Sequence, residues 1–393
     1  MSSHRRDGTA ARIIEMMPAE TAPVPVAPRR TVAAVLGKRA LVLIAVAVVG
    51  GGLSLALELS QGDPTATFIA SAVALAGLAG LVGEGTEQLG QRFGPGLTGV
   101  LQSALGNLPE LFIGIFSLRA GLIVVVQSAL IGSILANSLL VLGLAFVFGG
   151  LKNGVQTFGV QPVRMIATLL VVAVAALMIP TLATAPGAPD AGHAKELSVI
   201  VAVVLLILFA ASIPFSVGGG PGASSLEPTL ESAEVWPIRL AVVVLVVAAV
   251  GSAFVSDWFV DSLRPALARL GISEAFAGLV IVAIAGNAVE NVAGVQQALR
   301  NKADLAISLI LNSSLQVALA LIPALVLVSI VIGGPALTLV TSPLLIGALG
   351  LSVILGAFVV FDGESTWLEG LALIALYVIV AASVWFGPPI QAP

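Results

Sequence analysis

The sequence predicts an all-α polytopic membrane protein, and three observations support this fold class. First, 58% of its 393 residues are apolar and 10% are charged, whereas soluble domains carry about 25% charged residues. Second, the apolar runs are continuous over helical lengths, while the strands of a membrane barrel alternate apolar and polar residues. Third, a polar motif recurs inside these runs, which indicates two copies of one helical unit.

Eleven apolar segments are candidates for membrane-spanning helices, because turn residues or charges separate each from the next. They lie near residues 37–58, 66–90, 96–118, 121–149, 160–183, 195–216, 237–256, 273–299, 304–332, 335–361 and 367–387.

The segments group into five regions. Residues 1–36 lack an apolar core and are predicted to form a disordered, basic and Pro-rich cytoplasmic tail, with 37–58 as the first transmembrane helix. Residues 66–216 and 237–387 each hold five spans, and the acidic segment 217–236 connects them.

The distribution of basic residues orients the chain. A cytoplasmic N-terminus leaves only four of the 17 Lys and Arg residues on the outer side: Arg119, Lys195, Arg264 and Arg269. This asymmetry favours a cytoplasmic N-terminus. Compact loops indicate a prokaryotic inner (plasma) membrane.

Composition excludes several functions. Cysteine is absent, and the two histidines, His4 and His193, lie outside the apolar runs, so thiol chemistry and transition-metal sites are not expected. The net charge of -4 argues against nucleic-acid binding. No catalytic motif occurs in a span, so the chain is not expected to be an enzyme.

A shift of 180 residues aligns the two halves without gaps. Gly106-Asn107-Leu108-Pro109-Glu110 falls on Gly286-Asn287-Ala288-Val289-Glu290, and Ser133 falls on Ser313. Because five helices per unit is an odd number, successive units enter the membrane from opposite sides and form inverted repeats. The motif glutamates are then expected to face each other near the midplane.

The paired motif has the chemistry of a cation site. A carboxylate near the centre of a span costs about 2.5–3.5 kcal/mol, so Glu110 and Glu290 are candidate functional residues. Asn107 and Asn287 share a helical face with them, and oxygen ligands suit Ca2+ or Na+. Two close carboxylates in a low dielectric need a divalent cation or protons to neutralise them. This competition predicts a proton-coupled antiporter in which one repeat rocks against the other, while a structural pair of hydrogen-bonded glutamates is the alternative.

Further polar residues accompany the motif. Ser133 and Ser313 recur in register and are expected to supply oxygens to the ion. The others are candidates for a secondary polar pathway: Glu87, Gln127, Asn137 and Gln316. Helix-packing contacts, and for Glu87 an interfacial position, are the alternatives.

Three glutamates in the connecting segment, Glu227, Glu231 and Glu234, have helical spacing. They form either a cytoplasmic cation site or the solvated face of a hinge.

These residues resemble the calcium/proton antiporters of the cation/Ca2+ exchanger superfamily. The resemblance rests on the two Gly-Asn-x-x-Glu motifs, on Gln127-Ser128 with Gly132-Ser133, and on Ser313-Ser314-x-Gln316, and it covers residues 66–387. It implies one helix followed by two inverted five-helix repeats, with Glu110 and Glu290 as midplane Ca2+ and proton ligands. It also implies an acidic helix at the 217–236 connection and a role for the Thr86-Glu87 pair.

The sequence departs from the family pattern at three positions. Asn291 stands where members commonly have His, Asn312 where they have Gly, and Pro109 where they have Thr. Transport of Na+ or Mn2+ therefore stays open beside Ca2+/H+ exchange, with a cation channel as a further alternative. The expected partners are the lipid bilayer and small inorganic cations; no cofactor is expected, and the oligomeric state is open.

Overall fold

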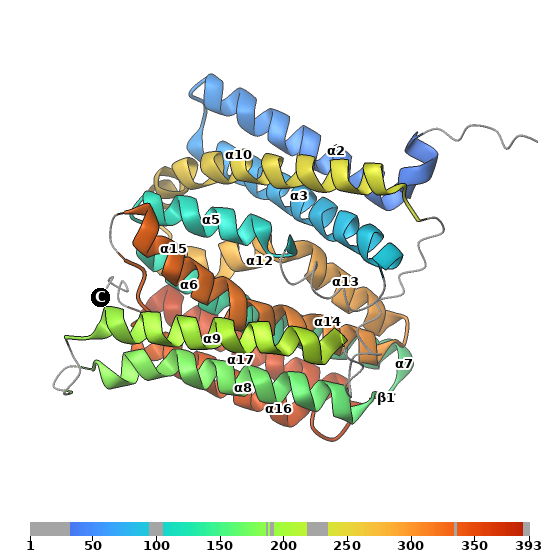
Figure 1. Cartoon of the computed structure of the whole chain (residues 1–393), viewed down its shortest axis with the longest axis vertical. Coiled ribbons are helices and arrows are strands. Elements are labelled where there is room, and N and C mark those ends of the chain that lie inside the picture. The colour runs from blue at the N-terminus through green and yellow to red at the C-terminus, as the bar shows by residue number, and fades with distance from the viewer. Residues whose placement is uncertain are drawn as a thin grey trace, which may run out of the picture.

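The computed structural model describes residues 32–93, 105–185, 188, 192–217, 235–333 and 336–387, and within these ranges the chain is almost wholly helical (Figure 1). The first half contains these elements: α2 (Val32–Leu59), α3 (Pro64–Phe93), α5 (Leu108–Arg119), α6 (Ile123–Leu135), the π-helical η1 (Ala136–Val141), α7 (Leu142–Asn153), β1 (Gln156–Thr157), α8 (Val160–Ala183) and α9 (Ala194–Val217).

The second half has a similar order of helices, but its strand lies between its last two helices. It contains α10 (Ile238–Leu270), α11 (Glu274–Phe276), the π-helical η3 (Ala277–Val282), α12 (Ala283–Gly286), α13 (Ala288–Leu299), α14 (Ala303–Gln316), the π-helical η4 (Val317–Leu321), α15 (Ile322–Ile332), α16 (Pro343–Val359), β2 (Glu364–Ser365) and α17 (Trp367–Phe386).

The polytopic helical class predicted from composition is confirmed. Among the described residues, eight helices are long and apolar enough to cross a membrane, or nine if the bent pair 274–286 and 290–299 forms one span. The other two expected spans coincide with α16, an apolar helix of 17 residues, and with α5, which has 12 residues. Most of the N-terminal part expected for the α5 span, 96–104, lies outside the described ranges.

Two helix boundaries differ from those expected. Helix α2 begins at Val32, within the segment predicted as a tail, and Gly37 interrupts it with a φ of 76°. Helix α10 continues to Leu270, well beyond residue 256, because its charged residues extend the helix out of the apolar run instead of ending it. Residues 1–31 of the expected tail lie outside the described ranges.

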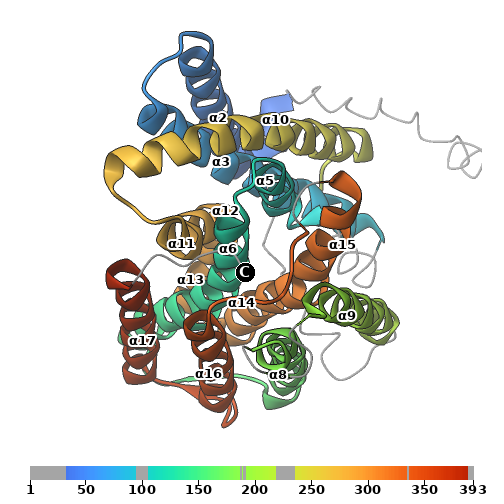
Figure 2. The ribbon, with the colours of Figure 1, turned by 90° about the vertical axis from the view of Figure 1, so that its left-hand side faces the viewer.

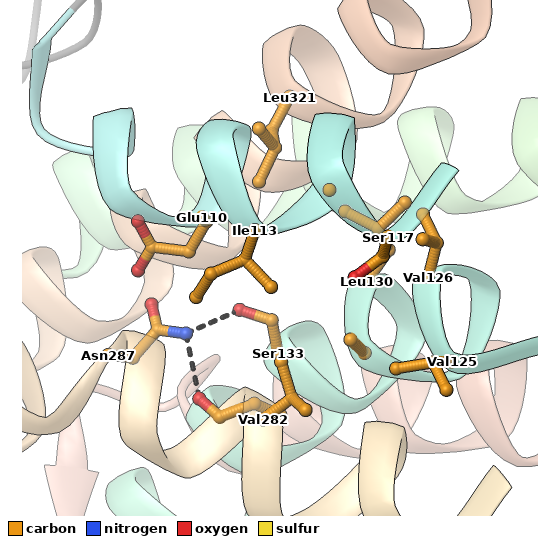
Figure 3. A pocket seen from close by; sticks show the side chains of 13 residues that line it. Glu110, Ile113, Ser117, Val125, Val126, Leu130, Ser133, Val282, Asn287 and Leu321 are labelled. Atoms are coloured by element: carbon orange, nitrogen blue, oxygen red, sulfur yellow. Dashed lines mark hydrogen bonds between the residues drawn. The ribbon is translucent and has the colours of Figure 1, made fainter. Parts of the chain in front are cut away.

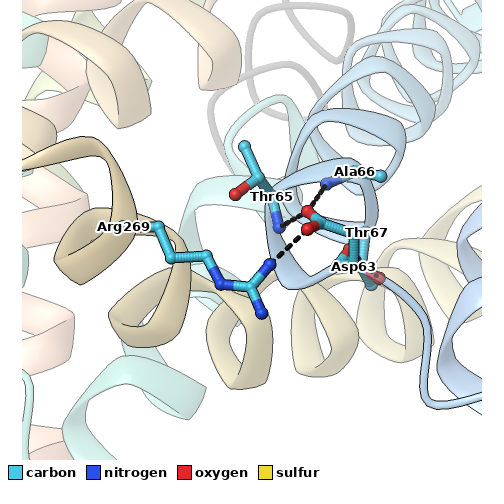
Figure 4. Close-up of polar contacts among 5 residues, drawn as sticks. All are labelled: Asp63, Thr65, Ala66, Thr67 and Arg269. Carbon is cyan, nitrogen blue, oxygen red and sulfur yellow. Dashed lines mark hydrogen bonds and ion pairs between the residues drawn. The ribbon is translucent and has the colours of Figure 1, made fainter.

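Helices α2, α3 and α10 pack together as one group (Figure 2). Their apolar side chains share a hydrophobic cluster that also takes in Trp236. Phe68 of α3 stacks on Phe259 of α10, with 4.9 Å between ring centroids. At one end, Asp63 accepts hydrogen bonds from the backbone N–H groups of Thr65 and Ala66 and pairs with Arg269 (Figure 4). This group therefore combines helices from both halves of the chain.

A second hydrophobic cluster unites the remaining long helices, α6 to α9 and α14 to α17. The segment 123–153 is the most enclosed, with 83% of its apolar window buried, and α9 is the most exposed at 17%. Strands β1 and β2 pair antiparallel, Gln156 with Ser365, and connect the loop after α7 to the loop after α16. The most buried helix is thus also one that carries the duplicated serine motif.

Candidate cation site

Both copies of the motif lie at breaks in a helix. The Gly106-Asn107 turn precedes α5, and Asn287 separates α12 from α13, where the two parts of the helix pair are bent by 64°. Glu110 and Glu290 therefore occupy the first turns of α5 and α13. The N-terminus of a helix carries partial positive charge, so each break stabilises a carboxylate at this position.

The two breaks meet inside the protein. A Cβ atom at Gly286 would lie 3.1 Å from both Cγ and Oε1 of Glu110, so this glycine allows the carboxylate of the first repeat to contact the break of the second. The expected convergence of the two motifs is therefore present in the structure.

Serines from the helices after each motif complete the cluster. The Ser313 hydroxyl donates a hydrogen bond to Oε2 of Glu290 at 2.5 Å, and Nδ2 of Asn137 donates to Ser313 at 3.0 Å. Nδ2 of Asn287 donates to the Ser133 hydroxyl at 2.7 Å. Each serine thus contacts the motif of the second repeat.

The two halves of the site are not equivalent. Nδ2 of Asn107 donates to Oε1 of Gln316 at 3.3 Å, a pairing that has no counterpart around Asn287. Among the hydrogen bonds of the described residues, none joins Ser133 to Glu110, and Oε2 of Glu110 is buried without a partner. Glu110 instead faces a cavity of about 30 Å3 together with Ser133 and Asn287 (Figure 3). This volume holds one or two water molecules.

Close packing of α6 against η3 places Ser133 beside Asn287. A Cβ atom at Gly132 would overlap the backbone of Leu279, and one at Gly278 would lie 2.8 Å from Cβ of Ser128. Only glycine permits this approach from both sides. The serine and the asparagine therefore depend on two glycines for their hydrogen bond.

Of the predicted pathway residues, Gln127 lies elsewhere. The Gln127 amide donates to the backbone oxygens of Thr338 and Val340 at 2.9 and 2.8 Å, and so connects α6 to the segment before α16. Glu87 is half-buried on α3, a helix that contacts α12 and α13. The acidic residues Glu227, Glu231 and Glu234 lie outside the described ranges.

The structure also reveals polar residues that sequence reasoning missed. Ser117 and Gln297 are 0% and 4% exposed, and within the described ranges Oγ of Ser117 and Oε1 of Gln297 have no hydrogen-bond partner. Gln297 lies 180 residues after Ser117. The alignment of the two repeats could therefore have identified this pair. Oδ1 of Asn291 is also buried without a partner among the described residues.

The assembled groups are oxygen donors with little positive charge around them. Across the described ranges, no three His, Cys, Asp or Glu side chains gather to hold a metal, so any cation here would rely on two carboxylates, amide and hydroxyl oxygens. Oxygen ligands of this kind suit a hard cation that binds weakly enough to dissociate again. The fold and this site are those of an integral membrane transporter.

Comparison with known proteins identifies the kind of transporter. The sodium/calcium exchanger protein family matches residues 64–218 and 240–386, in two parts that follow the two halves of the fold. The Ca(2+)/H(+) antiporter of Synechocystis is 35% identical over 86% of this chain and 95% of its own length. Ca(2+)/H(+) antiporter ChaA of Bacillus subtilis is 33% identical over 84% of this chain and 95% of its own length.

A solved structure agrees with these relatives. Native YfkE is 31% identical, with a TM-score of 0.76 over 88% of this chain and all of its own. The chain belongs to the Ca2+/H+ antiporter family within the sodium/calcium exchanger superfamily.

Proposed function

We propose that this protein exchanges Ca2+ for H+ across a membrane, with Glu110 and Glu290 as the ligands shared by the two ions. The observation that carries the proposal is the convergence of two helix breaks, which brings both carboxylates to one buried junction. The amide oxygens of Asn107 and Asn287 and the hydroxyls of Ser133 and Ser313 would supply the neutral oxygens. The Asn287 amide nitrogen already donates to Ser133, and Ser313 already donates to Glu290.

The two ions compete for the same oxygens. Low dielectric and mutual repulsion oppose the presence of two uncompensated carboxylates. A bound Ca2+ neutralises both at once, and two protons do the same. Entry of Ca2+ therefore expels protons, and protonation releases Ca2+, which couples the two fluxes.

Access must alternate between the two sides. The helices form two packed groups, one of α2, α3 and α10 and another of α6 to α9 with α14 to α17. Each group mixes helices of both repeats, so the boundary between the groups is a better candidate for the moving surface than the boundary between repeats. Glu110 lies on α5, a helix that contacts both α3 and α10.

We propose a cytoplasmic N-terminus from the distribution of basic residues, and a bacterial plasma membrane from the compact loops. The bacterial relatives are consistent with this location.

Flux in sealed vesicles tests the proposal. Purified protein in liposomes is expected to accumulate 45Ca2+ when a pH gradient is imposed, and Glu110→Gln or Glu290→Gln is expected to abolish accumulation. Glu58→Gln is the matched control, because Glu58 is exposed at the end of α2. Normal flux in both motif variants would overturn the assignment of the ligands.

The same vesicles separate the alternatives. Because Asn291 and Asn312 depart from the family pattern, Na+ and Mn2+ are compared with Ca2+ under one fixed pH gradient. A preference for Na+ or Mn2+ would change the identity of the transported cation but leave the proposed exchange mechanism in place. Cation flux without proton movement would indicate a channel instead.

A further inference from the structure

A groove runs between helices α8 and α9, neither of which contributes a side chain to the cation site. Its volume is about 520 Å3, within the range of about 300–1,000 Å3 typical of pockets that hold small organic ligands. It is far larger than the cavity of about 30 Å3 beside Glu110. The groove therefore has room for a bound molecule and no role in the proposed exchange.

The lining of the groove changes from polar to apolar along the helix axis. Gln161 and Arg164 in the first turns of α8 form the polar end, and Met165, Leu169 and Leu208 provide apolar wall. A phospholipid has the same order of chemistry, with a charged headgroup followed by hydrocarbon.

The charge of Arg164 is available to a ligand. Its side chain is exposed, and its guanidinium lies 4.2 Å from the ring centroid of Phe361, a contact that orients the cation without neutralising it. Arg164 takes part in none of the ion pairs found among the described residues, and none of the described residues that line the groove is a carboxylate. An anion is the complementary partner.

Helix α9 is the most exposed of the candidate membrane helices in the described ranges. Only 17% of the apolar window of α9 is buried within the protein. With the proposed cytoplasmic N-terminus, α8 begins and α9 ends at the inner leaflet. Basic pockets between membrane helices on the cytoplasmic side bind the headgroups of anionic lipids.

We propose that this groove binds an anionic phospholipid of the inner leaflet. The phosphate contacts Arg164, and an acyl chain lies along Met165, Leu169 and Leu208. The acidic segment 218–234, which follows α9, is a less suitable occupant, because docking it would place carboxylates against an apolar wall.

Native mass spectrometry of the purified full-length protein tests the charge. Phosphatidylglycerol is titrated against phosphatidylcholine with the same acyl chains. We expect the protein to prefer phosphatidylglycerol, and Arg164→Gln to weaken that binding about fivefold, since a basic residue at an anionic surface contributes about 1 kcal/mol. Arg119→Gln is the control, because Arg119 is exposed at the other end of the bundle in the proposed topology. Equal affinity for both lipids, or unchanged binding in Arg164→Gln, would overturn the proposal.

A second measurement identifies the occupant. The chain contains no cysteine, so Leu208→Cys can carry a unique photo-crosslinker at the apolar wall. Crosslinks to phosphatidylglycerol support the proposal, and crosslinks to residues 218–234 in its place refute it. Leu208→Trp fills the groove and is expected to weaken both lipids equally, whereas Arg164→Gln weakens only the anionic one.

Discussion

Replacing Gly132 with alanine should disrupt the cation site without changing any polar group. The new Cβ atom would lie 2.6 Å from Cα and 2.8 Å from the carbonyl carbon of Leu279, whereas carbon atoms pack at about 3.5–4.0 Å. Both opposing atoms are backbone, so no side-chain rotation can relieve the overlap. Helices α6 and η3 must therefore separate by about 1 Å.

The cost follows from two contributions. Overpacking of this kind costs about 1–3 kcal/mol. Separation by about 1 Å also lengthens the 2.7 Å hydrogen bond from Asn287 to Ser133 beyond its useful range, which removes about 0.5–1.5 kcal/mol more. We expect Gly132→Ala to lower the Tm of the purified protein by several degrees and to reduce 45Ca2+ accumulation in vesicles.

Gly347→Ala is the matched control, because Gly347 lies within α16 and a Cβ atom there would meet nothing within 4 Å. Alanine there should leave transport unchanged and stabilise the helix slightly, since glycine costs about 0.5–1 kcal/mol within a helix. Wild-type Tm and wild-type uptake in Gly132→Ala would refute the argument that close helix approach builds the site.

Three further predictions follow from single contacts. Ser313→Ala removes a hydrogen bond to a carboxylate, worth about 1.5–3 kcal/mol. The Ca2+ concentration for half-maximal uptake should therefore rise about tenfold or more. A rise below twofold would contradict this prediction. Ser117→Ala removes a buried hydroxyl that has no partner among the described residues and should raise the Tm, while a lower Tm would show that the hydroxyl is hydrated in the cavity. The backbone N–H of Ala66 is the main group that lowers the pKa of Asp63 below its ordinary value of 3.8. Ionised Asp63 therefore stabilises the fold above pH 3.8. This stabilisation is lost as the pH falls through the lowered pKa of the folded protein. The Tm difference between wild type and Asp63→Asn should therefore be constant near neutral pH and shrink below pH 3.8; a difference that grows on acidification would show the opposite shift.

The sequence predicted the features that depend on local chemistry. Continuous apolar runs located the helices, because a bilayer demands helices of about 20 apolar residues. The 180-residue shift placed Glu110 beside the second motif, because repeats of this kind bring equivalent positions together.

Pairings between distant helices could not be predicted in the same way. Gln127 was grouped with the polar pathway, but its amide binds Thr338 and Val340, because hydrogen-bond partners depend on helix rotation. The difference in hydrogen bonding between Glu110 and Glu290 could not be predicted either, since the two motifs have the same spacing. The end of α10 was placed too early because charged residues can continue a helix beyond the apolar part that the bilayer requires.

Two π-helical segments occupy equivalent places in the two halves of the chain. η1 covers residues 136–141, and η4 covers 317–321, which the 180-residue shift places at 137–141. A π-helical turn holds more residues than an α-helical turn, and such bulges are rare. Both halves nevertheless align without a gap from Gly106 to Leu139 and from Gly286 to Leu319. The same widened turn therefore follows the site serine in both halves, so it belongs to the repeated unit and not to one half alone.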